Sequence, residues 1–278
     1  MSAKISAHLT LRRCLSENMS KKKLVGSDLV TARKRLLQMH YESGVGHIGG
    51  NLSALDAALL VFHEYLESGD RFVLSKGHAA GALYITLWSI GRLTDSELKQ
   101  FHKDGTLLAG HPPAFGLDDV PFATGSLGHG LSLAAGTALA SRLQGKKKQV
   151  FCLTSDGEWQ EGATWEALIF ACHRRLENLT VLIDHNNLQG FGTTADVASM
   201  SPIWDKLRGF DAQITVVDGH DLHAIRSALN VPASRLRIIV LKTIKGRGVG
   251  FMENRMEWHY LPLKQQQYLQ AINEVESL

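Results

Sequence analysis

Two short polar stretches each follow an apolar run that is typical of a buried strand. Asp156 lies in the stretch Ser155-Asp156-Gly157 after the run at 149–154, and Asn186 follows the run at 179–184. Carboxylate and amide oxygens are ligands that Mg²⁺ prefers, and proteins usually hold Mg²⁺ with one or two carboxylates together with phosphate oxygens. The pattern therefore indicates a metal diphosphate site, although each stretch taken alone is also typical of an ordinary turn.

The elements around this pair predict how the two side chains are positioned. Residues 161–176 carry Ala163, Ala167 and Phe170 on one helical face, so we predict a helix there. With the apolar run on each side, the order is strand, helix, strand. Such a unit makes its two strands parallel neighbours. Ligands of parallel sheets bind beyond the carboxyl ends of the strands. We therefore expect Asp156 and Asn186 to lie side by side there.

Three histidines stand in contexts that favour a binding site. His47 lies in a glycine-rich loop ahead of a predicted helix at 54–65, and His78 stands between a predicted strand at 71–74 and a helix at 79–90. A single histidine in such a place is more often a cap, but two in matching contexts favour a site. His111 belongs to a long irregular segment at 103–125, which is typical of functional loops.

The remaining pattern predicts one α/β domain at residues 27–278, with a parallel central sheet and helices on both faces. Residues 1–26 are polar and basic and are predicted to form a flexible N-terminal extension. Further strands are expected at 214–217 and 236–241, and further helices at 29–41, 95–102, 131–143, 202–208, 222–229 and 264–275.

Composition narrows the class of protein. The 278 residues are 44% hydrophobic with a formal net charge of +3, and no apolar stretch approaches membrane-spanning length. The short basic runs at 21–23 and 146–148 do not indicate nucleic-acid binding. No apolar segment of a signal peptide is present. Cys14, Cys152 and Cys172 form no CxxC pair, which favours a reducing, cytoplasmic setting.

Several separated motifs together resemble the transketolase family in order and spacing. They are Gly46-His47-Ile48-Gly49-Gly50, Ser75-Lys76-Gly77-His78, Gly110-His111-Pro112, Gly125-Ser126-Leu127-Gly128-His129-Gly130, the pair Asp156-Gly157-Glu158 and Asn186-Asn187-Leu188, and His259. The resemblance covers residues 27–265 and is strongest to the N-terminal, diphosphate-binding subunit of a split transketolase. One departure is Ser155, which stands where the family motif has glycine.

The resemblance implies a cofactor, a metal and a role for each matching residue. The cofactor would be thiamine diphosphate with Mg²⁺ or Ca²⁺. The metal ligands would be Asp156, Asn186 and the carbonyl of Leu188. Cofactor contacts would come from His78, Gly125, Ser126, Leu127, Gly157, Glu158, Asn186 and His259. The catalytic residues that face the reacting carbon and the sugar hydroxyls would be His47, His111 and His259.

The resemblance also implies a partner. In this family the glutamate that activates the cofactor's aminopyrimidine lies in a second, pyrimidine-binding domain, and we do not assign that role to Glu158, Glu161 or Glu166. The expected protein is therefore an α₂β₂ assembly whose second subunit supplies the glutamate. It would transfer a two-carbon ketol unit from a ketose or ketose phosphate to an aldehyde.

Three alternatives stay open at this point. Glu161-Gly162 and Glu166-Ala167-Leu168 also resemble the α subunit of a 2-oxo acid dehydrogenase, although the histidines argue against it. A carboligase of specialised metabolism would use the same cofactor chemistry on another acceptor. A non-catalytic cofactor-binding subunit is the third alternative, because a fold does not guarantee activity.

Overall fold

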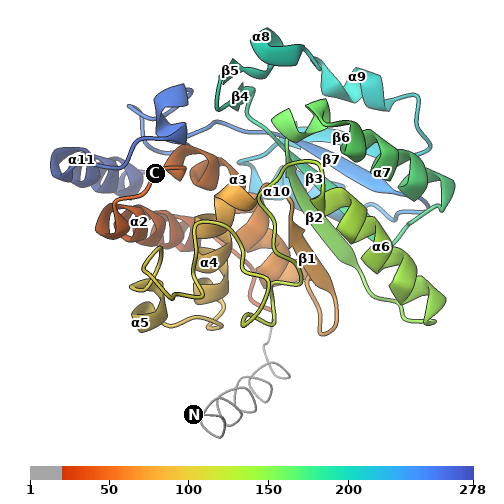
Figure 1. Cartoon of the computed structure of the whole chain (residues 1–278), viewed down its shortest axis with the longest axis horizontal. Coiled ribbons are helices and arrows are strands. Elements are labelled where there is room, and N and C mark those ends of the chain that lie inside the picture. Colours follow the sequence, from red (N-terminus) through yellow and green to blue (C-terminus); the bar gives the residue numbers. More distant parts are fainter. Residues whose placement is uncertain (1–20) are drawn as a thin grey trace, which may run out of the picture.

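A five-stranded parallel sheet forms the centre of the molecule in the computed structural model, which describes residues 21–278 (Figure 1). The strand order is β1-β2-β3-β7-β6. The strands are β1 (Arg71–Leu74), β2 (Val150–Ser155), β3 (Leu179–His185), β7 (Arg237–Lys242) and β6 (Gln213–Asp218). Every pairing is parallel. All residues of β2 and β3 are buried, which explains why both read as continuous apolar runs.

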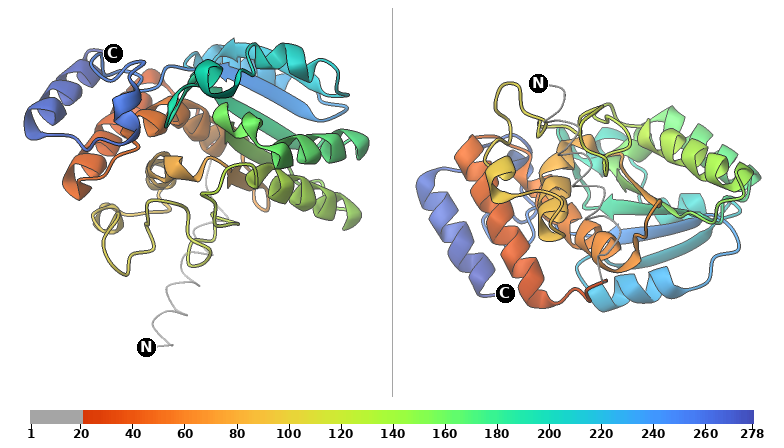
Figure 2. Two further views of the ribbon diagram at one scale, coloured as in Figure 1. Left: turned by 45° about the horizontal axis from the view of Figure 1, so that its top comes forward. Right: turned by 90° about the horizontal axis from the view of Figure 1, so that it is seen from below.

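Helices cover both faces of this sheet, as predicted (Figure 2). Successive side chains of β2 point to opposite faces, so Phe151 and Leu153 pack in one cluster while Val150 and Cys152 pack in the other. The first face packs against α2 (Gly26–Ser43), α3 (Ile48–Leu60), α4 (Ala80–Ser89), α10 (Leu222–Asn230) and α11 (Gln265–Glu276). The second packs against α6 (Gly130–Leu143), α7 (Gly162–His173) and α9 (Ile203–Leu207).

The start of α3 differs from the prediction of a helix at 54–65. The helix begins at Ile48, and a π-helical turn follows it at Val61–Tyr65. Its first turn contains Gly49 and Gly50, whose presence made this stretch read as a loop. A Cβ on Gly49 would lie 3.1 Å from Cγ of Lys245, so a small residue is needed for close packing there. The helix therefore starts immediately after His47.

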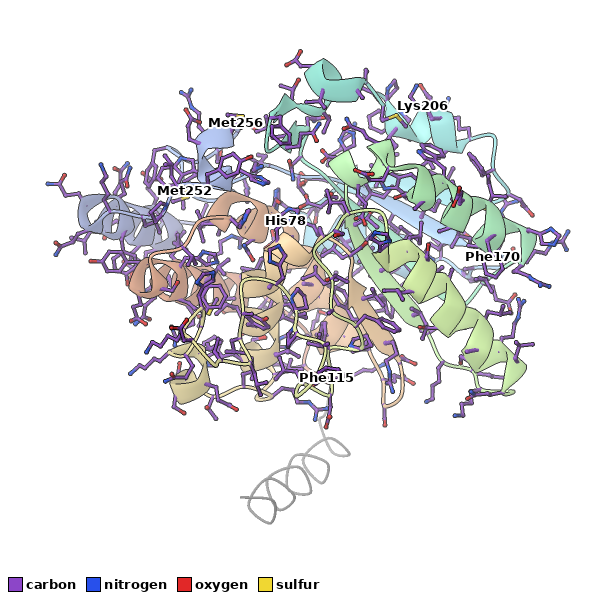
Figure 3. All side chains as sticks on the ribbon, viewed as in Figure 1. His78, Phe115, Phe170, Lys206, Met252 and Met256 are labelled. Carbon is purple, nitrogen blue, oxygen red and sulfur yellow. The ribbon has the colours of Figure 1, made fainter. Side chains whose placement is uncertain are left out.

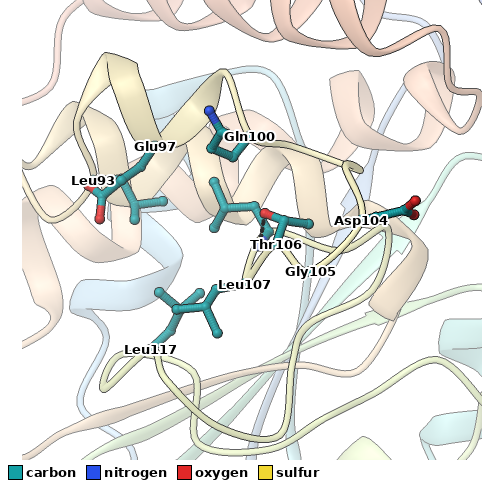
Figure 4. Close-up of a pocket in the computed structure, with 9 residues that line it drawn as sticks. Leu93, Glu97, Gln100, Asp104, Gly105, Thr106, Leu107 and Leu117 are labelled. Atoms are coloured by element: carbon teal, nitrogen blue, oxygen red, sulfur yellow. Dashed lines mark hydrogen bonds between the residues drawn. The ribbon is translucent and has the colours of Figure 1, made fainter. Parts of the chain in front are cut away.

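The irregular segment at 103–125 follows a helix shorter than predicted. The helix α5 spans Asp95–Leu98 rather than 95–102, and His102 has a left-handed φ of 60°. Leu108 and Leu117 anchor the segment in the core. A pocket of about 270 Å³ lies between α5 and this segment (Figure 4). None of the predicted site residues lines that pocket.

A short antiparallel hairpin also follows the sheet's third strand and was not predicted. It pairs β4 (Leu188–Gln189) with β5 (Gly192–Thr193), and α8 (Thr194–Ala198) comes next. Three short 3₁₀ turns complete the described elements, at Gly77–Ala79, Gly157–Gln160 and Met256–His259.

The predicted N-terminal extension is only partly covered, because residues 1–20, including Cys14, lie outside the described residues. Within 21–26, Leu24 is buried and its backbone N–H donates to Glu64 at 2.8 Å. Cys152 and Cys172 are buried free thiols. Among residues 21–278, no helix has both the length and the apolar character needed to cross a membrane.

Candidate active site

The carboxyl ends of β2 and β3 bring Asp156 and Asn186 together, as the predicted strand, helix, strand unit required. Ser155 pairs with Asp184 in the register, and the Asp156 N–H donates to the Asp184 carbonyl at 3.1 Å. The Asp156 carboxylate accepts a short hydrogen bond from the Asn187 N–H at the neighbouring strand end, and another at 2.8 Å from the adjacent Gly157 N–H. Asn187 can deliver its N–H because it has a left-handed φ of 63°.

The oxygens of this pair suit a hard cation. Burial, followed by the nearby Asp184, raises the pKa of Asp156 to about 7. A bound cation would reverse that effect by favouring the charged carboxylate. The Asn186 amide oxygen, which accepts from the Leu188 N–H at 3.0 Å, lies at the same edge. Within 21–278 no group of three or more His, Cys, Asp or Glu side chains forms a metal site, and Mg²⁺ here would complete its shell with phosphate oxygens.

Ser155, the one departure from the family motif, has a structural explanation. It is not among the residues with positive φ, so glycine's conformational freedom is not needed here. Its hydroxyl oxygen accepts a hydrogen bond from the Glu158 N–H at 3.2 Å, and its N–H donates to the Glu158 carboxylate at 3.3 Å. The serine therefore holds the turn that follows β2.

Glu158 joins three segments through its buried carboxylate. Besides Ser155, it accepts from the Gly128 N–H at 2.9 Å and from the Ser75 hydroxyl by a short bond. The bond from Gly128 fixes the loop that contains Gly125, Ser126 and Leu127, of which Ser126 is exposed and the other two are half-buried. Its protein partners give Glu158 a positioning role at this edge.

Four histidines lie beside Asp156 and Asn186, which we call the metal-type pair. Figure 3 shows one of them, His78, near the middle of the molecule. Ring centroids of His47 lie 4.9 Å from His259, 5.7 Å from His78 and 6.3 Å from His111, and those of His78 and His259 are 5.5 Å apart. These rings come from the start of α3, from the loops after β1 and within 103–125, and from the turn at 256–259. The structure thus brings together all four predicted histidines.

Desolvation is the largest cause that lowers the pKa values of all four rings. Burial, with a smaller contribution from Lys245, lowers the pKa of His259 to about 3. Burial also lowers the pKa of His78 well below its ordinary value, and it lowers the pKa values of His47 and His111. Neutral imidazoles can both donate and accept hydrogen bonds at neutral pH.

The backbone beneath the cluster is tightly packed. The His47 N–H donates to the His259 carbonyl at 3.1 Å. At the preceding position a Cβ on Gly46 would lie 2.3 Å from the Tyr260 carbonyl oxygen, so only glycine allows the two segments to approach this closely. His47 itself has a left-handed φ of 63°.

A buried ion pair between Asp184 and Lys76 lies under both parts of the site. The Asp184 carboxylate accepts hydrogen bonds from Lys76, from Ser53 at 2.6 Å and from Thr243. Burial alone would raise the pKa of Asp184, but the Lys76 charge and these hydrogen bonds lower it. Sequence reasoning missed this pair because the two residues are far apart along the chain and no local pattern shows that their side chains meet.

Lys245 is the other charged residue at this site that was missed. Its ammonium group lies 2.9 Å from His259 Nδ1 and donates to the Leu188 carbonyl at 3.3 Å. Burial, then the Lys76 charge, lowers the pKa of Lys245 to about 8. The available signal was its place in a glycine-rich stretch at a strand end. The charge lies where an anionic diphosphate beside the metal-type pair would be bound.

A parallel sheet that carries the Asp156 and Asn186 pair and a histidine cluster at its carboxyl edge is the arrangement of a thiamine diphosphate-binding domain. The chain belongs to the transketolase family: the family described as "Transketolase, thiamine diphosphate binding domain" matches residues 28–275. The predicted family, fold class and cofactor are confirmed.

Similar proteins include single subunits of transketolases. The chain is 32% identical over 255 residues to one subunit of the apulose-4-phosphate transketolase of Phocaeicola vulgatus, covering 87% of this chain and 90% of that protein. It is 34% identical over 257 residues to a 6-deoxy-6-sulfo-D-fructose transketolase subunit of a Clostridium species, covering 88% and 93%. The prediction of a transketolase-type chain that forms one subunit of a split enzyme agrees with these relatives and is confirmed.

Single-chain transketolases are similar over part of their length. Residues of this chain are 36% identical to the transketolase of Homo sapiens over 253 residues, which is 87% of this chain but 40% of that protein. The crystal structure of Campylobacter jejuni transketolase superposes with a TM-score of 0.82 at 28% identity, covering 90% of this chain and 42% of that one. This chain thus spans about two fifths of the single-chain enzymes.

Proposed function

We propose that the chain is the diphosphate-binding subunit of a two-subunit transketolase that moves a two-carbon ketol unit from a ketose or ketose phosphate to an aldehyde. The observation that carries this proposal is that the metal-type pair, Asp156 and Asn186, and the histidine cluster share one edge of the sheet. Sugar hydroxyls require several polar groups around the reacting carbon, and the four rings supply them. The histidines favour this function over 2-oxo acid decarboxylation.

Thiamine diphosphate, when bound, would supply the nucleophilic carbon and the electron sink. Asp156, Asn186 and the Leu188 carbonyl would hold Mg²⁺ or Ca²⁺ between the protein and the diphosphate. Gly157 begins the turn after β2, and its N–H lies beside the Asp156 carboxylate, so it would border the diphosphate. The Lys245 charge at the Leu188 carbonyl adds to the attraction for an anion.

The histidines would position the substrate and transfer its protons. At His259, Nδ1 faces the Lys245 ammonium group and accepts its hydrogen bond, which places the ring proton on Nε2. A neutral ring of this tautomer can donate from Nε2 to a substrate oxygen. His47 and His111, whose pKa values are lowered chiefly by burial, would accept or return protons at neutral pH.

The catalytic site would be completed by a second subunit, in an α₂β₂ assembly. The relatives that are themselves named as single subunits of transketolases support a partner. Glu158 is engaged by protein donors, while Glu161 and Glu166 are exposed, so none of the three is placed as an activator of the cofactor. The partner would supply that carboxylate and contacts to the sugar. The buried free thiols Cys152 and Cys172 support a cytoplasmic setting.

The proposal is tested by assaying the purified full chain with thiamine diphosphate and Mg²⁺, alone and after addition of the candidate partner subunit. Ketol transfer is expected only from the mixture. Robust turnover by the chain alone would refute the split site. If the mixture decarboxylates a 2-oxo acid and shows no ketol transfer, the chain is instead a subunit of a 2-oxo acid dehydrogenase.

A further inference from the structure

A buried amide in the first turn of α3 lies directly beneath the histidine cluster. Asn51 is 1% exposed. Its Nδ2 donates to the His47 carbonyl at 2.8 Å and to the His78 carbonyl at 3.3 Å, and its Oδ1 accepts from the Ala82 N–H at 2.6 Å. One side chain therefore connects the starts of α3 and α4, the two helices that follow His47 and His78.

These contacts use both the amide donors and the amide oxygen of the Asn51 side chain. Two carbonyls need two donors on one short side chain, and the Ala82 N–H needs an acceptor. Aspartate would place a charge against two carbonyl oxygens, and serine or alanine would leave at least one buried group without its partner. The requirement comes from the backbone geometry of this turn.

The backbone of His47 needs such support. Its φ of 63° is unfavourable for a residue with a Cβ. The His47 carbonyl accepts from both the side chain and the backbone N–H of Asn51, while its N–H donates to the His259 carbonyl. Hydrogen bonds thus link His78, Asn51, His47 and His259 in one continuous chain below their rings.

We propose that Asn51 is a positioning residue that fixes the relative placement of His47 and His78, and through His47 that of His259, for proton transfer in the proposed ketol transfer. The role of the histidines rests on the proposed function, whereas the fixing of their backbones by Asn51 does not. Displacement of a reacting group by about 1 Å is enough to slow an enzyme strongly.

Two substitutions separate the two donated bonds. In a helix, a serine hydroxyl donates to the carbonyl four residues earlier, which for position 51 is that of His47. Asn51→Ser therefore keeps the bond to His47 and loses the bond to His78, and Asn51→Ala loses both. Asn178→Ala is the matched control, because Asn178 is also buried and donates to two carbonyls, those of Ala138 and Lys148, both at 3.0 Å and away from the site.

The first readout is imidazole NMR of the full chain labelled with ¹³C-histidine, followed through a pH titration. Asn51→Ser should change the His78 resonances and leave those of His47 near their positions, while Asn51→Ala should change both. The exposed His173 and His223 serve as internal references. Asn178→Ala should leave all four site histidines unchanged even if it lowers the unfolding temperature.

The second readout is the steady-state rate of the assembled two-subunit protein. Asn51→Ala should lower kcat about tenfold or more, with a much smaller change in KM for the ketose, because the substrate contacts remain but are misaligned. Asn178→Ala should leave both constants unchanged.

If the two Asn51 variants leave the His47 and His78 resonances unchanged, or if Asn178→Ala alters them equally, the positioning role is wrong. If the unmodified assembly shows no ketol transfer, the proposed function fails instead, and the resonances still decide whether Asn51 fixes the histidines.

Discussion

The two halves of the site are built in different ways. The metal-type half is local: Asp156, Gly157 and Asn187 are connected by hydrogen bonds within one strand, helix, strand unit. The histidine half collects His47 and His259 from opposite ends of the domain, with His78 and His111 between them. The first half depends on neighbouring turns, and the second on contacts between segments that are distant in sequence.

Under the proposed function, this difference sets the binding of metal and diphosphate apart from proton transfer to the substrate. A diphosphate can be held by turns whose geometry the two strand ends already determine. The histidines keep their arrangement only while α3, α4 and the turn at 256–259 remain packed together. The Asp184 to Lys76 ion pair belongs to both halves, because Asp184 lies near the end of β3 while its other partners Ser53 and Thr243 lie in α3 and after β7.

The largest expected effect therefore comes from breaking that shared pair. Asp184→Asn leaves the Lys76 ammonium group buried without a counter-charge, which should lower the free energy of unfolding by about 3–5 kcal/mol. Urea unfolding measures this. The double variant Asp184→Asn with Lys76→Met should recover much of the loss. Asp205→Asn, in an exposed pair with Arg208, is the control and should change little. A loss below about 1 kcal/mol for the single variant would contradict the shared role.

Removing the Asp156 carboxylate should weaken cofactor binding, and the activity of the assembly should fall with it. Asp156→Ala is expected to weaken Mg²⁺-dependent binding of thiamine diphosphate by at least about a hundredfold, since loss of an outer partner of a metal ligand already costs roughly 10–100-fold. Calorimetric titration of the assembled protein measures it. Asp221→Ala, which removes the cap of α10, should bind as the unmodified protein does. Unchanged activity of the Asp156→Ala assembly would support the non-catalytic alternative.

Acid should destabilise the fold through His40, a buried histidine on α2, the helix that precedes His47. His40, buried on α2, has a pKa lowered to about 4, chiefly by burial. The unfolded chain binds this proton near pH 6.5, so stability is full above that pH and falls as the pH drops toward 4. The His40→Leu variant should therefore lose less stability between about pH 7 and pH 5, by about 2 kcal/mol.

Urea unfolding at the two pH values checks this difference. The exposed His173→Gln is the control and should follow the unmodified chain. Parallel loss of stability in the His40→Leu variant and the unmodified chain would show that acid acts elsewhere.

The smallest effect is expected at Ser155. Ser155→Gly restores the family residue but removes the acceptor for the Glu158 N–H and adds backbone freedom, so unfolding should become easier by about 0.5–1 kcal/mol. Thiamine diphosphate affinity should not change, because the Asp156 contacts remain. A markedly tighter affinity would mean that the serine distorts the turn.

The sequence predicted the local half of the site better than the distant half. Asp156 and Asn186 follow strands that are readable as apolar runs, and their parallel pairing follows from the helix between them. The start of α3 was misplaced because Gly49 and Gly50 are poor helix formers, whereas the structure uses Gly49 for its close approach to Lys245 and Trp258.

Buried charged residues were the other omission. Asp184 reads as part of an apolar strand and Lys76 as part of a loop, and nothing local shows that their side chains meet. The contacts of Lys245 with His259 and with the Leu188 carbonyl likewise cannot be predicted from its neighbours in the sequence. The aspect of the site that sequence patterns do not encode is the pairing of charges across distant segments, which depends on the completed fold.

The close contact of Gly46 with Tyr260, together with the bond from the His47 N–H to the His259 carbonyl, has a consequence for biosynthesis. On the ribosome, α2 and α3 emerge long before the turn at 256–259 that they contact. Tyr41 of α2 stacks on Tyr268 of α11, with ring centroids 4.4 Å apart, and this contact can form only later still. The nascent chain can form the strand ends that carry Asp156 and Asn186 earlier. Completion of the histidine half must therefore be a late event in the synthesis of each polypeptide.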